Sequence, residues 1–256
     1  MDEERQRAEQ VIAGRNAVME ALRAGREIDS LLVAKGEHTG SLNVILAKAR
    51  ALGIPVKDAA SVKLESLGGR NHQGVVAVAS AVAYRDVEDI FALAEQRGEP
   101  PFIIVADGLE DPHNLGAVIR TAEGAGAHGV IIPKRRAAGL THAVGKAAAG
   151  ALEYVPVARV NSIAVLLDKL KERGVWIYGA DRGGQNWCEA ELSGAVALVV
   201  GSEGDGISRL VREKCDFMLS LPMRGQINSL NASVACGVLM YEVARQRLKL
   251  EHREKK

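Results

Sequence analysis

The amino-acid sequence predicts an α/β protein in which a small N-terminal α/β domain precedes a larger domain built on a parallel sheet. Two observations support this prediction. Short apolar runs alternate along the chain with segments of helical periodicity, which is typical of strands joined by helices. From residue 101 onward these runs are nearly continuous, as expected for parallel strands that helices cover on both faces.

The N-terminal part is expected to form a separate α/β domain over residues 1–82. Segments with helical spacing that end in glycine lie at residues 11–25, 41–53 and 61–69. Strands are expected at residues 28–34, 54–59 and 74–82. The more polar stretch 83–100 ends in glycine and proline, so we expect a linker with one or two helical turns there.

The C-terminal part, residues 101–256, is expected to be a second domain. Its apolar runs predict strands at residues 102–107, 128–133, 155–160, 175–181, 196–203 and 217–223. Helical segments alternate with them at residues 115–126, 141–152, 162–174, 207–215 and 231–250. This alternation predicts parallel strands, whose carboxyl ends form the ligand-binding edge of such sheets.

The bulk composition is that of an ordinary globular chain, with 47% hydrophobic and 25% charged residues. The formal net charge of +1 gives no argument for a nucleic-acid, membrane or acidic partner, so RNA binding must rest on local features. The first ten residues lack the apolar region of a signal peptide, and no apolar run is long enough to span a membrane. We therefore expect a soluble, cytoplasmic protein.

Cysteine and histidine give no indication of a metal site. The cysteines Cys188, Cys215 and Cys236 are far apart and form no CxxC pair, which fits a reducing compartment. The histidines show no metal-ligand spacing and are expected to be surface or packing residues. They are His38, His72, His113, His128, His142 and His252.

Two glycine-rich segments resemble nucleotide-binding motifs but do not fit them. GAGAHG at 124–129 matches GxGxxG, yet it follows a predicted helix and opens a predicted strand, the reverse of the dinucleotide motif. A helix end followed by a turn explains it better. GLTHAVGKA at 139–147 has its first glycine one residue too far from Gly145 and alanine where a P-loop has serine or threonine. A nucleotide triphosphatase is therefore excluded.

Three polar segments that follow predicted strands carry the candidate chemistry. In DGLEDPHNLGAVIRTAEGAG (107–126), Asn114 is placed as a helix cap, and Arg120 lies off the apolar face of the helix. Arg120 is either a solvated charge or a side chain directed into the ligand crevice of the sheet.

The second segment, LVVGSEGDGIS (198–208), places Glu203 inside a glycine-rich turn where backbone can approach a ligand closely. A plain strand–helix connection is the alternative. The third segment is LPMRGQINSLNASVACG (221–237). Ser229 and Asn231 are both plausible helix caps there, and with Asn228 they form a denser polar cluster than one cap needs.

Taken together, DPHNLGAVIRTAEGAG, LVVGSEGDGIS and LPMRGQINSLNASVA resemble the three ordered motifs of the SpoU (TrmH) family of RNA 2′-O-ribose methyltransferases. The resemblance covers about residues 100–247. In the N-terminal part, IAGRNAVMEAL and RNHQGVVAV are similar to the RNA-binding domain of the RlmB-type enzymes of that family. These enzymes methylate a guanosine ribose in large-subunit ribosomal RNA, so the resemblance favours that substrate, with transfer RNA as the alternative.

The resemblance implies a fold and an assembly that spacing alone does not predict. It implies a SPOUT-type catalytic domain whose C-terminal part forms a deep trefoil knot around bent S-adenosylmethionine. It also implies a homodimer packed through the catalytic domains, an N-terminal domain that binds structured RNA, and no metal. Gly201, Leu221 and Leu230 match the positions whose backbone holds the cofactor.

By the same resemblance, the catalytic positions are Arg120, Asn114, Glu203, Ser229 and Asn231. The family treats the arginine at the Arg120 position as catalytic, with general base as one suggested role. Because arginine side chains stay protonated in proteins, Arg120 could instead bind a neighbouring phosphate and stabilise the developing alkoxide. The other four residues are expected to orient the ribose, Arg120 or the cofactor loops.

The stretch between Glu123 and Glu153 contains several basic residues and no acid. Its Lys134, Arg135 and Arg136 are expected to contact RNA phosphates, with a solvated basic loop as the alternative. Aromatic residues make up only 4% of the chain, so recognition is expected to use RNA shape and phosphates more than base stacking.

Two functions from other classes compete with the methyltransferase. A nucleotide-dependent oxidoreductase on a doubly wound sheet is disfavoured by the misplaced GxGxxG. A non-enzymatic RNA-binding or resistance-type protein that has kept the fold is disfavoured because Asn114, Arg120, Glu203 and Asn231 are all present.

Overall fold

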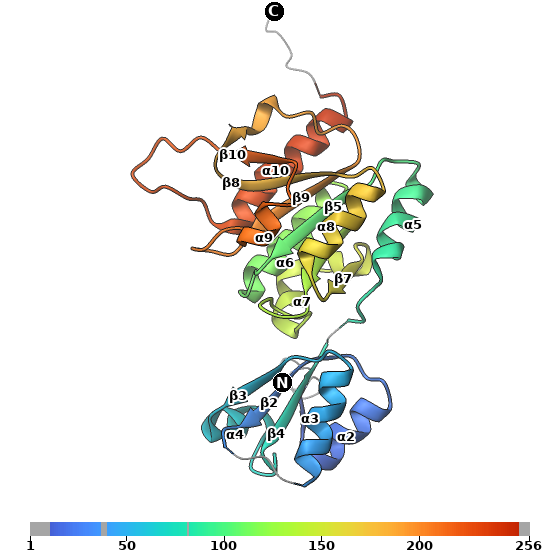
Figure 1. Cartoon of the computed structure of the whole chain (residues 1–256), viewed down its shortest axis with the longest axis vertical. Helices are drawn as coiled ribbons and strands as arrows, with labels where there is room; N and C mark the ends of the chain where they lie inside the picture. Colours follow the sequence, from blue (N-terminus) through green and yellow to red (C-terminus); the bar gives the residue numbers. More distant parts are fainter. Residues whose placement is uncertain (1–10, 37–39, 81, 251–256) are drawn as a thin grey trace, which may run out of the picture. The chain divides into compact units, whose positions relative to one another are not determined.

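A computed structural model describes residues 11–36, 40–80 and 82–250 of the chain (Figure 1). The chain divides into two compact units, residues 1–83 with 139–145 and residues 84–138 with 146–256. Each unit has its own sheet and its own core. The first ten residues, for which no signal peptide is predicted, lie outside the described residues, as do His38 and His252.

The first unit is a mixed four-stranded sheet with helices on both faces. Its elements are β1 (Val11–Ala13), α2 (Arg15–Arg23), β2 (Ile28–Ala34), α3 (Ser41–Ala51), β3 (Val56–Ala59), α4 (Ser61–Gly68) and β4 (Val75–Ala79). The strand order is β1-β4-β2-β3, and only the β2–β3 pair is parallel. One core joins α2 and α3 to the sheet, and a smaller one joins Leu64 of α4 to Leu32 and Val76.

The start of this unit differs from the sequence prediction, which placed residues 11–25 in one helix. Val11–Ala13 form a strand that pairs antiparallel with β4, and the helix begins only at Arg15. Between them Gly14 has φ 94°, a conformation that no helix residue adopts. The β-branched pair at 11 and 12 thus finds a strand partner that helical periodicity alone does not reveal.

The second unit is a six-stranded sheet in the order β10-β8-β9-β5-β6-β7, and all of its strand pairs are parallel. Its strands are β5 (Phe102–Asp107), β6 (Gly129–Pro133), β7 (Val157–Val160), β8 (Trp176–Asn186), β9 (Val196–Gly201) and β10 (Phe217–Ser220). The α-helices are α5 (Val87–Arg97), α6 (Pro112–Gly124), α8 (Ile163–Glu172), α9 (Arg209–Arg212) and α10 (Ala232–Arg247), with short 3-10 turns at Ala151–Glu153 and Trp187–Glu189. Helix α7 (His142–Ala148) begins in the segment 139–145, which is assigned to the first unit, and ends in the second.

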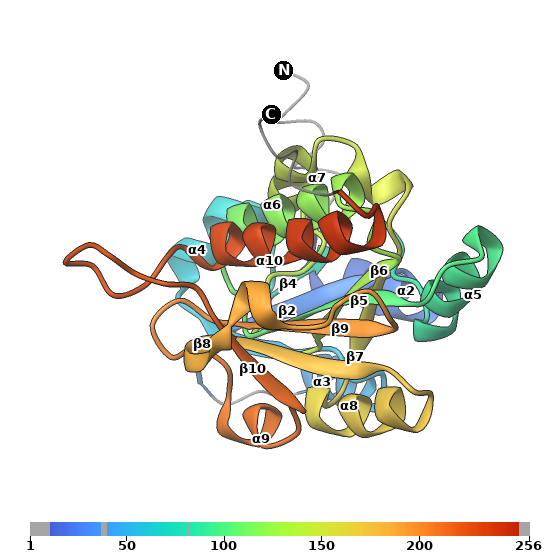
Figure 2. The same cartoon turned by 90° about the horizontal axis from the view of Figure 1, so that it is seen from above.

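The predicted α/β class with a parallel sheet is confirmed. Helices α6 and α10 lie together on one face of the six-stranded sheet, and α8 and α9 lie on the other (Figure 2). Strands β5 and β9 are buried almost throughout, as their unbroken apolar runs predict. Ile103, Val105 and Val199 of these strands pack against Leu167 and Leu170 of α8.

The segment 83–100, predicted as a linker, contains the three-turn helix α5. Asp86 and Asp89 form a capping box at its start, and Gly98 ends it in a left-handed conformation. Ile90 is fully buried in the core of the second unit. The polar residues that made the segment resemble a linker occupy the outer face of an amphipathic helix.

The glycine-rich segment 124–129 follows α6 and opens β6, which confirms that it is a helix end and not a dinucleotide motif. His128 within it is fully buried, as a packing residue. Its Nδ1 accepts a hydrogen bond from the Phe102 amide at 2.9 Å, and its Nε2 lies 3.1 Å from Glu99. Burial lowers the pKa of His128, so the ring is neutral at pH 7.

None of the helices in the described ranges is long and apolar enough to cross a membrane. Within the same residues, no group of three or more histidine, cysteine or acidic side chains could hold a metal ion. Cys188, Cys215 and Cys236 are all free thiols, as their spacing predicts.

Candidate active site

The three polar segments singled out in the sequence meet at one edge of the six-stranded sheet. They follow β5, β9 and β10, and because all strands run parallel their carboxyl ends lie at the same edge. Ligands bind at this edge in open α/β sheets. The backbone topology therefore gathers side chains that are up to 117 residues apart in the sequence.

Helix α6 begins earlier than predicted, and this changes the role of Asn114. Asp111 is the N-cap, since its side chain accepts from the His113 amide at 3.0 Å, and Pro112 occupies the first turn. Asn114 is therefore not the cap. It lies inside the first turn and is buried, which leaves its carboxamide available for side-chain partners.

Asn114, Glu203 and Asn231 form a closed hydrogen-bonded cluster, one residue from each segment. The side-chain Nδ2 groups of Asn114 and Asn231 both donate to the same oxygen, Glu203 Oε1, at 2.8 and 2.6 Å. Asn231 Nδ2 also donates to Asn114 Oδ1 at 3.0 Å. Asn231 Oδ1 caps helix α10, accepting from the Ser233 and Val234 amides, so the prediction of a cap at this position is confirmed.

The turn that carries Glu203 is held by its own backbone. Ser202 and Gly206 exchange two backbone hydrogen bonds of 3.0 and 3.1 Å, and Gly204 and Gly206 have positive φ angles. A Cβ at Gly201 would overlap the backbone of Gly206 and Ile207. Glycine is thus required at 201 by the turn itself, where the sequence suggested close approach of a ligand.

A cavity of about 460 Å³ lies beside this turn. It is formed by residues 180–182 in the middle of β8, the end of β9 with the turn that follows it, the segment 221–231 and the first turns of α10. The predicted cofactor residues Gly201, Leu221 and Leu230 all line it, together with Glu203, Ser229 and Asn231. In Figure 1 the segment between β10 and α10 extends away from the sheet as a long loop, and residues 222–231 are exposed.

The cavity is also lined by residues that were not predicted from the sequence. They include Asp181 and Arg182 after the first part of β8, and Ala235 and Leu239 of α10. The available signal for the first two was the glycine pair at 183–184, which directly follows the strand predicted at residues 175–181, since glycines beside or within a strand often mark a bulge. Ala235 and Leu239 follow Asn231 at intervals of four, the helical spacing that brings them to the same face.

The cavity fits a ligand of cofactor size that carries positive charge. Its volume lies within the range of about 300–1,000 Å³ found for small-molecule sites. Apolar side chains of Leu219, Leu221 and Leu239 provide surface for a flat ring, next to polar backbone of the 201–206 turn. The charged lining residues are the three carboxylates Asp181, Glu203 and Asp205 and one arginine, Arg182. This surplus of carboxylates favours a cationic group.

Arg120 is not part of the cluster. It follows Asn114 by six residues, which on an α-helix places it about 9 Å along the axis and roughly 120° around it. Its side chain is exposed, and it does not line the cavity. A single chain therefore does not bring Arg120 together with Asn114, Glu203 and Asn231.

The predicted basic loop lies beside the segment that follows β5. The Ala138 amide donates to the Leu109 carbonyl at 2.8 Å, which ties the loop to the turn before α6. The backbone of Arg136 is also close to Gly108, since a Cβ placed on Gly108 would lie 3.8 Å from the Arg136 carbonyl oxygen. Lys134 instead lines a second cavity, between α5 and α8. The three basic residues thus follow β6 at the same sheet edge, and of the three only Lys134 lines the second cavity.

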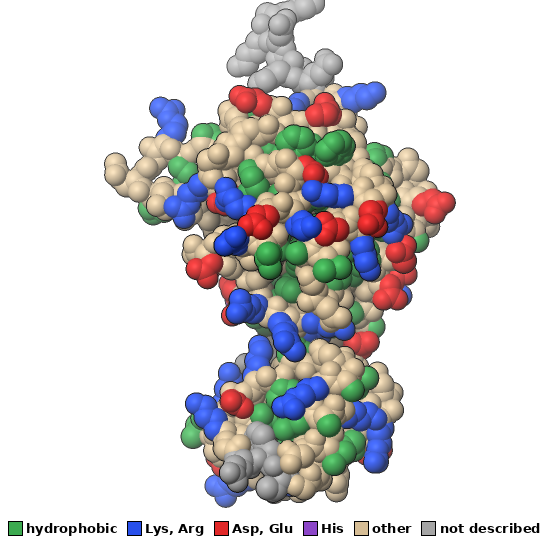
Figure 3. Space-filling view, in the orientation of Figure 1, with side chains coloured by type: hydrophobic (Ala, Val, Ile, Leu, Met, Phe, Trp, Pro, Cys, Tyr) green, Lys and Arg blue, Asp and Glu red, His purple; other side chains and the backbone are tan. Residues whose placement is uncertain are grey.

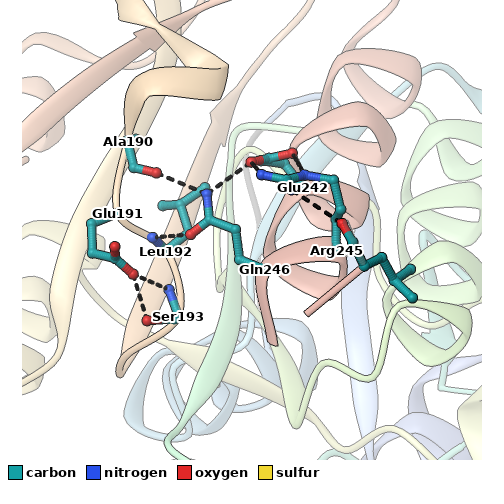
Figure 4. A network of polar contacts seen from close by, with 8 residues as sticks. Ala190, Glu191, Leu192, Ser193, Glu242, Arg245 and Gln246 are labelled. Atoms are coloured by element: carbon teal, nitrogen blue, oxygen red, sulfur yellow. Dashed lines mark hydrogen bonds and ion pairs between the residues drawn. The ribbon is translucent and has the colours of Figure 1, made fainter. Parts of the chain in front are cut away.

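Helix α10, which carries Asn231 at its start, is anchored near its other end by a polar network (Figure 4). Glu242 is 3% exposed and accepts two hydrogen bonds from Arg245 and one from Gln246, at 2.7 to 2.8 Å. The hydrogen bonds from Arg245 hold the pKa of Glu242 below its usual value. Gln246 also bonds Ala190 and Leu192, which fixes the helix against the chain that precedes β9.

Comparison with known proteins gives matches along the whole chain. Residues 101–241 match the model of the SpoU rRNA Methylase family, and residues 11–85 match the model described as RNA 2′-O ribose methyltransferase substrate binding. A Bacillus subtilis (strain 168) protein, YacO, is named for the TrmH family of tRNA/rRNA methyltransferases. It is 46% identical over 237 residues, covering 92% of this chain and 95% of that protein.

Two solved structures have the same architecture. The SpoU methyltransferase AviRb from Streptomyces viridochromogenes, in complex with AdoMet, matches with a TM-score of 0.60 and 26% identity, covering 93% of this chain and 90% of that chain. An AdoMet-bound rRNA methyltransferase from Sinorhizobium meliloti matches with a TM-score of 0.57 and 25% identity, covering 93% and 87%.

Proposed function

Since this chain belongs to the SpoU (TrmH) family of RNA methyltransferases, we propose that it methylates the ribose 2′-hydroxyl of a guanosine in large-subunit ribosomal RNA. The methyl donor is S-adenosylmethionine. The observation that carries the proposal is the Asn114–Glu203–Asn231 cluster at the edge of a cavity of cofactor size.

S-adenosylmethionine supplies an activated methyl group, so the chain has to hold the cofactor, orient the ribose and accept or stabilise a proton. In the proposed assignment, the backbone at Gly201, Leu221 and Leu230 holds the cofactor. Glu203 keeps one carboxylate oxygen, Oε2, outside the hydrogen bonds of the cluster. That oxygen can accept from a ribose hydroxyl, while Asn114 and Asn231 fix the carboxylate.

Ser229 and Arg120 complete the proposed catalytic set. The segment that carries Ser229 is exposed next to the cavity, where a hydroxyl can bond to substrate or cofactor. The exposed guanidinium of Arg120 is available to an RNA phosphate or to the developing alkoxide. Lys134, Arg135 and Arg136 are proposed to contact further RNA phosphates.

The choice of ribosomal RNA rests on the first unit. IAGRNAVMEAL and RNHQGVVAV, which resemble the ribosomal RNA branch of the family, form α2 with its flanking strand and the segment leading into β4. The substrate-binding family model spans the same unit, which supports RNA as its partner. The same reaction on transfer RNA is the second candidate, because the name of the Bacillus subtilis relative includes both RNAs.

A methyl-transfer assay distinguishes the two substrates. We expect the purified protein to transfer labelled methyl groups to large-subunit ribosomal RNA transcripts at least about tenfold faster than to bulk transfer RNA, a preference worth about 1.4 kcal/mol. Mapping of alkali-resistant linkages should place the methyl group on a guanosine ribose. Faster transfer to transfer RNA would reverse the substrate assignment. Methylation of a base would contradict the reaction.

We further propose a homodimer formed through the second unit. Helix α10 is apolar on both sides, because Leu239, Met240 and Val243 are buried while Val238 and Tyr241 are exposed. Val234 and Leu248 continue the exposed side. A helix with apolar residues all round is normally covered on all sides, and a second copy of the chain would cover this one.

Charge on the exposed side of α10 should weaken the proposed dimer. Val238→Glu is expected to raise the dissociation constant by about tenfold, since it places an unpaired carboxylate in an apolar contact. Val165→Glu, at a 55% exposed position of α8, is the matched control and should leave the dimer intact. Sedimentation equilibrium measures both. A monomeric wild-type protein would contradict the dimer, as would a variant that associates equally well.

Two further properties follow from the family resemblance. The chain from β9 to α10 is proposed to form the trefoil knot, with the cavity beside the knotted segment. The protein is proposed to act in the cytoplasm, where its RNA substrate and its three free thiols would be compatible with a reducing environment.

A further inference from the structure

Strand β8 contains a five-residue bulge at the wall of the cavity. Against β10, Gly179 pairs with Met218, but the next pair is Gln185 with Leu219. Residues 180–184 of β8 therefore have no counterpart on β10. Bulges of this kind re-aim side chains and are common next to active sites.

The glycine pair explains how the chain can leave and rejoin the strand. Gly183 has φ +77°, a conformation that L side chains rarely adopt. A Cβ at Gly184 would overlap the carbonyl oxygen of Met218, so only glycine lets the two strands approach this closely. The sequence Arg182-Gly183-Gly184 thus builds the bulge at a defined position.

The bulge presents Asp181 and Arg182 to the cavity, which both residues line. Asp181 is fixed from both sides, since its carboxylate forms an ion pair with Arg212 of α9 and accepts a hydrogen bond from the Arg182 amide. Arg182 itself is exposed. Over the ranges 11–36, 40–80 and 82–250, no carboxylate pairs with its guanidinium.

The unpaired state of Arg182 distinguishes it from its neighbours. Arg212 and Arg209 of α9 pair with Asp181 and Glu213, and Lys214 pairs with Asp168. Acidic and basic side chains are interspersed on the face of the second unit shown in Figure 3. A guanidinium without a carboxylate partner at the mouth of a cavity is suited to bind a phosphate in a bidentate manner.

We propose that Arg182 contacts a phosphate of the RNA substrate and that the bulge at 180–184, clamped through Asp181 and Arg212, holds it in place. This inference rests on the proposed function, and it makes Arg182 a positioning residue for the RNA.

The test compares variants in RNA affinity, measured by fluorescence anisotropy, and in the KM and kcat of methyl transfer to the ribosomal RNA transcript. Arg182→Gln should weaken RNA affinity and raise KM by about tenfold, the effect of losing one charge-assisted hydrogen bond. The kcat at saturating RNA should stay within about twofold, since uniform binding is lost. The slope of log affinity against log salt should decrease by about 0.7 to 0.9.

Arg209→Gln is the matched control, because it removes the same charge from a side chain that is 89% exposed and does not line the cavity. It should change RNA affinity by less than about twofold. Arg182→Lys should restore part of the affinity but not all of it, since lysine lacks the planar fork.

Asp181→Asn separates a positioned contact from a general charge effect. It removes a negative charge, so a charge effect predicts tighter RNA binding, whereas release of the clamp predicts weaker binding. We expect weaker binding, by about three- to tenfold. Tighter or unchanged binding would contradict the clamp.

Calorimetry with S-adenosylmethionine completes the design. Unchanged cofactor affinity in Arg182→Gln supports the proposal, whereas weakened affinity would make Arg182 a ligand of the cofactor carboxylate and overturn it. Equal RNA affinities of Arg182→Gln and Arg209→Gln would also overturn it. If the wild-type protein binds RNA but transfers no methyl group, the proposed function fails, while the anisotropy comparison still decides the role of Arg182.

Discussion

Arg120→Ala is expected to lower the single-turnover rate of methyl transfer at saturating RNA by about 100- to 1000-fold, with cofactor affinity nearly unchanged. This is the effect of removing one group that stabilises charge in the transition state. Arg120 is exposed and lies away from the cavity, so the substitution should not disturb the cofactor loops. The measurement is a rapid-quench assay with labelled S-adenosylmethionine and the ribosomal RNA transcript.

Two controls accompany Arg120→Ala. Arg120→Lys should recover little of the rate if a bidentate contact matters, because lysine keeps the charge but loses the fork. Neutralising Lys134, Arg135 and Arg136 together should weaken RNA binding and flatten its salt dependence, while the rate at saturating RNA is largely kept. A rate near that of the wild type in Arg120→Ala would leave Arg120 as a solvated charge.

Ala235→Phe is expected to weaken binding of S-adenosylmethionine by roughly a hundredfold, equivalent to about 3 kcal/mol. Ala235 lines the cavity from helix α10 and is only partly buried, so a larger side chain there should fill the space proposed for the cofactor without disrupting the core. Isothermal titration calorimetry measures the loss, and the thermal midpoint reports on folding.

Ala235→Ser is the matched control and should bind the cofactor within about threefold of wild type, since its side chain is nearly the same size. Position 201 is a poorer test, because a side chain at Gly201 would collide with Gly206 and change the turn itself. Normal cofactor affinity in Ala235→Phe, with an unchanged thermal midpoint, would move the cofactor site away from this cavity.

The sequence was sufficient to predict the α/β class, the parallel order of elements and the three polar segments. These features depend on local periodicity and on motifs within short stretches, which a linear chain displays directly. The sequence also limited the cap of α10 to Ser229 or Asn231, because capping involves a side chain and backbone amides only two or three residues away, and the structure shows that Asn231 is the cap. Family resemblance added the reaction and the cofactor.

Other local predictions were wrong where a neighbouring residue made a better helix cap or where a distant strand paired with the segment. Asn114 was predicted to cap α6, but Asp111 and Pro112 precede it and begin the helix earlier. Residues 11–13 were predicted as helix, but β4 offers them a pairing edge. The segment predicted as a linker forms helix α5, because its apolar residues pack against core residues from distant parts of the chain.

Only the tertiary structure could decide which side chains meet. Asn114, Glu203 and Asn231 lie 28 to 117 residues apart, and their contacts exist because parallel strands end at one edge. The register shift that exposes Arg182 depends on how β8 pairs with β10, a long-range choice without a local periodicity. The separation of Arg120 from the cluster was decided likewise, because Glu203 and Asn231 contact α6 at Asn114, and the six-residue spacing places Arg120 roughly 120° away around the helix axis.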